Sequence, residues 1–185
     1  MPILKTTKDE IIHRAVEVFH QRGYHATSMS DLAQACGLQK GSFYHHFSSK
    51  EELMREVLAV VNNYYDKKIF SFINNRELSP AQRLTQLWGE QRSRLTHTSG
   101  GCLFGNMALE TANLQTDFRP QIMSFFKHWA ESLTALFAEK YSLEQAQIYA
   151  NQSVMMMEGA VMLARLYQND DYLEQAFQFT LNLLS

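Results

Sequence analysis

The sequence has little cysteine and little proline, and it has no apolar run of membrane-spanning length. Its two cysteines, Cys36 and Cys102, are too few for a disulfide framework, and neither has metal-ligand spacing with a histidine. The longest apolar-rich stretch, residues 154–166, is shorter than the roughly 20 residues that cross a bilayer. It is also interrupted by Glu158 and Arg165. We therefore expect no membrane span, no metal site and no disulfide scaffold.

Signals of catalysis and of export are also missing. The sequence has no Ser/His/Asp order, phosphate-binding loop, metal-ligand spacing or cofactor fingerprint, so we predict neither an enzyme nor a bound cofactor. Residues 1–15 carry charges throughout and include no apolar stretch of signal-peptide length. We expect a cytoplasmic protein.

What the sequence does contain indicates a helical protein. Hydrophobic residues make up 45% of the 185, with only three prolines and eight glycines, and no segment shows strand-like alternation. Helical periodicity and capping signals predict an all-α fold of about nine helices. Their expected ranges are about 7–22, 29–36, 40–46, 50–74, 80–97, 102–113, 117–140, with Asp117 as N-cap, 143–167 and 172–184.

Charge is distributed unevenly along the chain. The formal net charge is −2, but residues 1–50 carry six lysines and arginines against four acidic residues, together with five of the seven histidines. A modest positive excess of this kind favours a nucleic-acid partner held by a few placed contacts and by two copies of the protein.

Residues 28–53 have the pattern of two short helices joined by a tight turn. Ser28 and Asp31 have capping-box spacing, which predicts a helix start at Met29. Gly37 supplies the left-handed conformation that ends this helix, and the next one starts near Lys40. Two helices that cross through such a turn form a helix-turn-helix.

The second of these helices has two distinct sides. Phe43 and Phe47 are four residues apart and should be buried, which leaves a surface of hydrogen-bond donors. Residues 38–47 contain no carboxylate, and nearby helix N-termini add backbone N–H groups for phosphate. The alternative is a plain helical corner with a solvated polar face. We predict DNA contacts from Thr27, Gln39, Lys40, Gly41, Ser42, Tyr44, His45 and Lys50.

Residues 11–55 resemble the DNA-binding domain of the TetR/AcrR family of transcriptional regulators. The matching residues include Asp31-Leu32-Ala33, Gly37-Leu38, the run from Lys40 to Phe47, and Ser49-Lys50-Glu51. Gln39 departs from the small or basic residue more usual there, which bears on which bases are contacted. The resemblance implies a helix-turn-helix domain over residues 1–50 and a helical ligand-binding and dimerisation domain over residues 51–185, with an inducer pocket.

The helix expected over 143–167 is apolar on most sides, so it should be buried on most sides. Little chain remains to cover it, and a second copy is the natural cover. A monomer whose loops cover these faces is the alternative. We predict a homodimer interface that includes Val154, Met157, Val161, Ala164, Phe177 and Leu181.

The C-terminal part is rich in aromatic residues and methionine, which suit an apolar ligand pocket, although most of them are expected to be core. Buried Glu110 and Glu158 need a partner, either a basic side chain, solvent or a cationic ligand group. We predict ligand contacts from Trp88, Cys102, Phe104, Met107, Glu110, Phe125, Trp129, Met155 and Glu158.

Cys102 follows two glycines at an expected helix N-terminus, where the helix dipole favours the thiolate. The segment Gly101-Cys102-Leu103 resembles the corresponding region of TetR-like repressors that sense electrophiles or oxidants, and a buried structural cysteine is the alternative.

Together these features predict a homodimeric repressor of a palindromic DNA operator, released by a small-molecule inducer. The helix expected over 50–74, about 36 Å long, should couple the two domains. An effector-independent regulator controlled by a protein partner is the alternative.

Overall fold

The structure is a computed structural model that describes residues 6–97, 100–111 and 118–184, and within these ranges it contains helices and no strands. The predicted N-cap at Asp117 lies outside the described residues. The helices are α1 (Lys8–Arg22), α2 (Met29–Ala35), α3 (Lys40–Tyr44), α4 (Lys50–Tyr64), α5 (Pro80–His97), α6 (Leu103–Thr111), α7 (Arg119–Phe137), α8 (Leu143–Tyr167) and α9 (Asp171–Asn182). The all-α prediction is confirmed, and the observed helices fall within a few residues of most predicted ranges.

The chain divides into two compact units. Unit 1 comprises residues 1–61 and 103–122, and unit 2 comprises residues 62–102 and 123–185. We call residues 6–61 the head. The predicted domain boundary after residue 50 falls inside unit 1, and α6, although distant in sequence, belongs to the same unit as the head.

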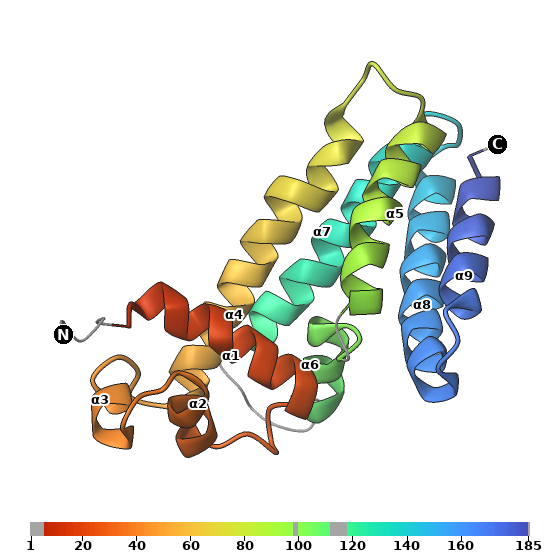
Figure 1. The fold of residues 1–185 in the computed structure, drawn as a ribbon. Helices are drawn as coiled ribbons and strands as arrows, with labels where there is room; N and C mark the ends of the chain where they lie inside the picture. Colours follow the sequence, from red (N-terminus) through yellow and green to blue (C-terminus); the bar gives the residue numbers. More distant parts are fainter. Residues whose placement is uncertain (1–5, 98–99, 112–117, 185) are drawn as a thin grey trace. The chain divides into compact units, whose positions relative to one another are not determined.

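In unit 1, α1, α2, α3 and the beginning of α4 lie close together (Figure 1), and their buried side chains form one apolar core. The α1 helix starts at a capping box, because the Thr7 hydroxyl accepts from the Glu10 N–H while the Glu10 carboxylate accepts from the Thr7 N–H. Its apolar stripe packs against the helix-turn-helix. The fully buried side chains of this core include Ile11, Phe19, Leu32, Phe43, Phe47, Leu53 and Met54.

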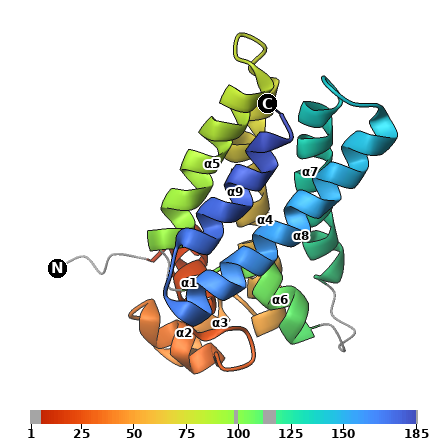
Figure 2. The same ribbon diagram turned by 90° about the vertical axis from the view of Figure 1, so that its right-hand side faces the viewer.

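In unit 2, α5, α7, α8 and α9 run side by side, with α8 and α9 as an antiparallel pair (Figure 2). Leu84, Trp129 and Phe137 are among the core residues. Five residues, 138–142, separate the end of α7 from the start of α8, and the last of them, Ser142, is the N-cap of α8. Adjacent helices joined by short loops form a bundle, and the space between them is filled by large apolar side chains.

One predicted helix is divided. The segment expected as a continuous helix over 50–74 is α-helical only to Tyr64; a π-helical turn (Tyr65–Ile69) and a 3-10 segment (Phe70–Asn74) follow. The Tyr65 ring packs edge-on against Phe125, with ring centroids 5.0 Å apart. Helical periodicity in the sequence does not reveal such a change of pitch, because π-helical and 3-10 turns are short departures from a continuous helical pattern.

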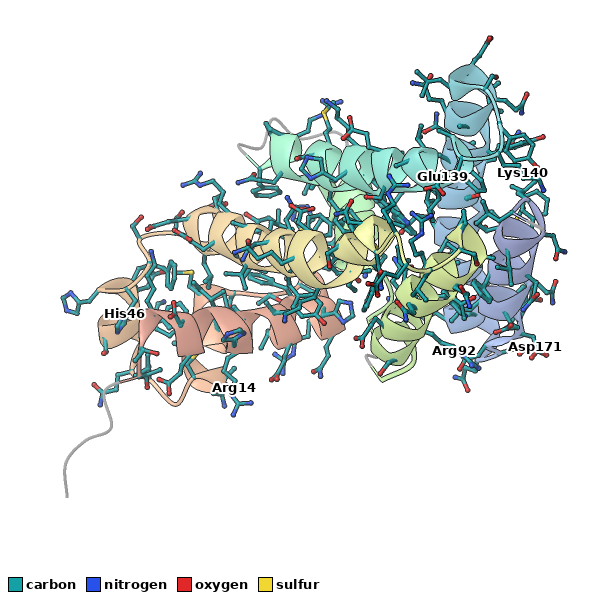
Figure 3. The ribbon with its side chains drawn as sticks, turned by 90° about the horizontal axis from the view of Figure 1, so that it is seen from above. Arg14, His46, Arg92, Glu139, Lys140 and Asp171 are labelled. Carbon is teal, nitrogen blue, oxygen red and sulfur yellow. The ribbon has the colours of Figure 1, made fainter. Side chains whose placement is uncertain are left out.

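A buried arginine links α5 to the 3-10 segment and to the end of α7 by hydrogen bonds. Arg83, on α5, is 1% exposed; its Nη1 donates to the Ile73 carbonyl at 2.8 Å. Its Nη2 donates to both carboxylate oxygens of Glu139, at 2.8 and 2.7 Å. Glu139 lies just beyond the end of α7 (Figure 3). Arg76 also donates to this carboxylate, but its side chain is 65% exposed.

Candidate functional site

The helix-turn-helix is built by local sequence signals. Ser28 and Asp31 form the expected capping box at the start of α2, with the Ser28 N–H donating to the Asp31 carboxylate at 2.8 Å. After α2 the chain turns at Gly37, whose φ is +66°. That conformation favours glycine, and it lets α3 begin only five residues after α2 ends.

The α3 helix buries its two phenylalanines and exposes its polar residues. Phe43 and Phe47 are fully buried, with ring centroids 6.4 Å apart. Six of the eight predicted DNA contacts are exposed on or beside this helix, and none of them carries a negative charge. They are Gln39, Lys40, Gly41, Ser42, Tyr44 and His45. We call these six residues the α3 surface; it offers amide, ammonium, hydroxyl and imidazole groups to an anionic partner.

The other two predicted contacts, Thr27 and Lys50, lie inside the head. The Thr27 side chain is 1% exposed, and its hydroxyl donates to the Gly23 carbonyl at 2.6 Å. The Lys50 ammonium donates to the carbonyls of Tyr24 and Thr27, at 2.7 and 2.9 Å, and lies 4.2 Å from the Tyr24 ring centroid. Burial lowers the pKa of Lys50 from its ordinary value. Their side chains therefore position the turn before α2.

Tyr24 joins this turn to α4 and to the rest of unit 1. Its phenol donates to the Glu51 carboxylate at 2.9 Å, and burial raises the pKa of the Tyr24 hydroxyl. Its ring lies edge-on to Phe118, with centroids 5.4 Å apart. No local sequence signal marks Tyr24, because its partners come from separate segments of unit 1.

Glu110 of α6 is bound by the backbone of the same turn. Its Oε2 accepts from the N–H groups of Tyr24 and His25, at 2.8 and 2.9 Å. The imidazole Nε2 of His25 lies 3.1 Å from the Glu110 carbonyl oxygen. Gly23, with φ of +80°, lies under the carboxylate. Successive N–H groups beside a glycine form an anion-binding nest, and here the anion is the chain's own carboxylate.

Gly23→Ala should destabilise the protein more than Gly37→Ala. Both glycines have positive φ, which costs an alanine on the order of 1–3 kcal/mol. An added Cβ at Gly23 would also lie only 2.6 Å from Oε1 of Glu110. An added Cβ at Gly37 would have no atom within 4 Å. Urea unfolding of both variants measures the difference. Equal losses at the two positions would contradict a close fit between Gly23 and Glu110.

The predicted ligand residues are spread over several places. Trp88 and Trp129 line a cavity in unit 2. Phe104 and Met107 are buried on α6, while Phe125 contacts Tyr65 and Phe70. These three residues are not part of the cavity lining. The remaining four are also outside it: Glu110 in its nest, Met155 with 65% of its surface exposed, and the pair Cys102 and Glu158.

Cys102 and Glu158 are in contact in unit 2. The Cys102 thiol donates to the Glu158 carboxylate, whose Oε1 is buried without a hydrogen-bond partner. Burial raises the pKa of Glu158 above its ordinary value. Two turns along α8, Arg165 Nη1 donates to the Gly100 carbonyl at 2.8 Å, so it anchors the loop that carries Cys102.

The cavity lies between α5, α7, α8 and α9 and has a volume of about 20 Å³. Seven of its ten lining residues are apolar and three are uncharged polar residues. They are Leu84, Leu87, Trp88, Gln91, Trp129, Leu133, Ser153, Met157, Phe177 and Thr180. The sequence indicated the tryptophans through their size; it gave no signal for the polar three, because their convergence depends on how four helices pack.

The predicted dimer residues and the exposed apolar residues of α8 are different sets. Met157, Val161, Ala164 and Phe177 are buried within the chain's own fold, and Val154 and Leu181 are partly exposed. Four of the exposed apolar side chains of α8 recur at spacings of seven or four residues, and we call these four the α8 stripe. They are Ile148, Met155, Met162 and Leu166, between 44% and 68% exposed.

Among the described residues no group of three or more His, Cys, Asp and Glu side chains could hold a metal ion. No helix in the described ranges is long and apolar enough to cross a membrane.

Two family models match the chain. One, described as bacterial regulatory proteins of the tetR family, matches residues 11–57, which contain the helix-turn-helix. The other, described as the C-terminal domain of LmrA/YxaF-like transcriptional regulators, matches residues 80–178. The second match alone spans more than half of the 185 residues.

Individual proteins match over almost the whole chain. An uncharacterized HTH-type transcriptional regulator of Lactococcus lactis is 28% identical over 183 residues, covering 94% of this chain and 91% of its own length. The HTH-type transcriptional repressor DhaR of a Mycobacterium species is 24% identical over 174 residues, covering 91% and 87%. The crystal structure of a TetR transcriptional regulator from Legionella pneumophila superposes with a TM-score of 0.89 at 27% identity, covering all of both chains.

Proposed function

Because the chain belongs to the TetR family of bacterial regulatory proteins, and is therefore a DNA-binding transcriptional regulator rather than an enzyme, we propose that it is a homodimeric repressor. In this proposal a small-molecule inducer releases it from a palindromic operator. The name of DhaR, a transcriptional repressor at 24% identity, supports the sign of regulation.

The observation that carries the proposal is the α3 surface. It is exposed, free of carboxylates and held by two fully buried phenylalanines. A recognition helix fixed in this way enters the major groove, where amide, ammonium and hydroxyl groups contact base edges and phosphates. The side chains of Thr27 and Lys50 act from within the head, by holding the turn that leads into α2.

The α8 stripe supports the homodimer. Four large apolar side chains on one helix, each more than two-fifths exposed, form a surface that association would remove from water. Phe179 of α9 is 41% exposed and adds to the apolar area. A two-fold dimer through these helices presents two α3 surfaces, and such symmetry requires a palindromic operator with half-sites about one helical turn, or a multiple of it, apart.

In this proposal two helices, α4 and α6, transmit the effect of inducer binding to the head. The chain passes from one unit to the other within α4, directly before the π-helical turn, so a change of pitch there alters how residues 50–61 are held. The α6 helix, fastened to the head through Glu110, begins directly after Cys102 of unit 2. An inducer that displaces either helix changes the spacing of the two α3 surfaces, and operator affinity falls.

Cys102 is proposed as an additional sensor of electrophiles or oxidants. Its thiol donates to a buried carboxylate, which can accept the thiol proton when sulfur attacks an electrophile. N-ethylmaleimide should release the wild-type protein and the Cys36→Ser variant from the operator. The Cys102→Ser variant should stay bound. Release of the Cys102→Ser protein at the wild-type rate would rule out this role.

Regulation by a protein partner is the second candidate, since it needs no internal ligand site. The cavity of unit 2 favours the inducer model. Operator affinity measured with purified protein and candidate small molecules, with no other protein present, separates the two.

Salt dependence tests which lysines touch DNA. On a duplex selected by the wild-type protein, Lys40→Gln should weaken binding and reduce the slope of log K against log salt by about 2, one phosphate contact per subunit. Lys50→Gln should leave this slope unchanged and lower the stability of the head, because its ammonium bonds two backbone carbonyls. If purified protein selected no duplex at low salt, the proposed function would fail.

A further inference from the structure

We propose that the cavity between α5, α7, α8 and α9 takes a small, uncharged ligand with a flat apolar body and an amide- or alcohol-type polar end. The inference rests on the proposed function, because it gives the chemical class of the inducer. The class is neutral, and it therefore differs from the cationic ligand group that was one of the three possible partners of Glu110 and Glu158.

The first argument is an amide in the cavity lining. Gln91 on α5 is 4% exposed, and its side chain lines the cavity. A glutamine amide has two N–H donors and an acceptor oxygen. Leaving such a group unpaired in an apolar interior costs free energy, so a polar atom in the cavity would be stabilised there.

The second argument concerns the two hydroxyls opposite. Ser153 is 2% exposed and donates to the Tyr149 carbonyl at 2.8 Å; Thr180 is 4% exposed and donates to the Ala176 carbonyl at 2.9 Å. Each hydroxyl has one proton, and both protons are used within their own helices. Only acceptor lone pairs remain for the cavity, so the ligand must supply an N–H or O–H donor.

The third argument is the absence of charge in the lining. None of the ten lining residues is acidic, basic or a histidine. An ion in this cavity would lose its hydration without gaining a counter-charge, which is strongly unfavourable. Glu158 belongs to α8 but is outside the lining, and the carboxylate of Glu110 is already occupied. A neutral ligand is therefore favoured over a carboxylate or an amine.

The shape of the lining gives the body of the ligand. Trp88 and Phe177 are stacked, with centroids 5.1 Å apart and ring planes 9° apart, and Trp129 lines the same cavity. Flat aromatic walls favour a flat body. About 20 Å³ holds one water molecule, so a larger ligand must displace a lining side chain. Met157 is unbranched and adapts most readily.

The full-length protein provides its own probe. Both tryptophans of the chain line the cavity, so intrinsic fluorescence reports on its occupancy. We expect a saturable fluorescence change with benzamide, which is neutral, flat and both donor and acceptor. Benzoate and benzylammonium, of similar size but charged, should bind at least about a hundredfold more weakly. Equal binding of a charged probe, or no benzamide response up to 50 mM, about the limit of a weak site, would overturn the proposal.

Variants of lining residues test whether benzamide binds in the cavity. Gln91→Leu is similar in volume and removes the amide, and it should reduce benzamide affinity about tenfold or more. Thr180→Val, which keeps the shape but removes an acceptor, should reduce it about fivefold. Gln86→Leu, on the exposed side of the same helix, is the control and should bind as wild type. Unchanged affinity in both cavity variants would show that benzamide binds elsewhere, and the proposal would fail.

These titrations contain no DNA, so their outcome is independent of operator binding. If benzamide binds as expected but leaves operator affinity unchanged, the cavity site stands and its inducer role fails. If the protein binds no operator, the proposed function fails while the ligand class is still decided by the fluorescence titrations.

Discussion

The double variant Met162→Asp/Leu166→Asp is expected to be monomeric at micromolar concentration and to bind a palindromic operator at least about a hundredfold more weakly than wild type. Both side chains belong to the α8 stripe and are more than half exposed, so the substitutions leave the core of the subunit intact. Four carboxylates would face each other in the dimer, unpaired and desolvated. Without dimerisation each α3 surface binds one half-site alone, and the gain from simultaneous binding is lost.

Met123→Asp is the matched control. Met123 is 64% exposed, comparable with Met162 at 60%, but it lies on α7 outside the α8 stripe. Sedimentation velocity gives the mass, and fluorescence anisotropy gives the operator affinity. A double variant that still sediments as a dimer would show that the dimer interface lies elsewhere. If that dimeric variant also lost DNA binding, the α8 stripe would be needed for DNA binding but not for dimerisation.

Arg83→Ala is expected to lower the free energy of unfolding by about 1–3 kcal/mol, because the buried Ile73 carbonyl loses its side-chain donor. The side chain of Arg83 is 2% exposed, and its loss removes the side-chain donor to the Ile73 carbonyl and leaves Arg76 as the arginine bound to the Glu139 carboxylate. Arg76→Ala removes the second, exposed arginine from the same carboxylate and should cost no more than about 1 kcal/mol. Urea unfolding of the three proteins at neutral pH measures both values.

The difference between wild type and Arg83→Ala should also depend on pH. The hydrogen bonds from Arg83 hold the pKa of Glu139 below its ordinary value of 4.5. A carboxyl group whose pKa is lower in the folded state stabilises the protein above the unfolded-state pKa, and this stabilisation is lost as pH falls through the folded-state pKa. The gap between the two proteins should therefore narrow below about pH 4.5. A constant gap down to acid unfolding would mean that Arg83 acts through packing alone.

The helix-turn-helix could be predicted because its signals are local. The Ser28–Asp31 capping box, the turn at Gly37 and the Phe43–Phe47 spacing each involve residues within four positions of one another, and each acts through backbone geometry that the sequence specifies directly. The exposed side of α3 followed from the buried one. For the same reason the starts of α5 and α8 were predicted at the observed residues.

Long-range packing could not be predicted. Thr27 and Lys50 have the residue types of phosphate contacts, but carbonyl groups of the turn capture their donors. On α8, apolar residues surround most of the helix, so the sequence does not distinguish the side that faces the bundle from the side that faces outward. Met157 and Met162 are the same residue type on the same helix, yet Met157 is 6% exposed and Met162 is 60% exposed.

The attachment of Glu110 through main-chain N–H groups has an evolutionary consequence. Any residue except proline at positions 24 and 25 still provides those two donors, so drift at these positions leaves the attachment in place. Positions 23 and 110 lack this freedom, because a side chain at the first would collide with an acidic group at the second. Across homologous proteins, loss of the acid should accompany loss of the glycine.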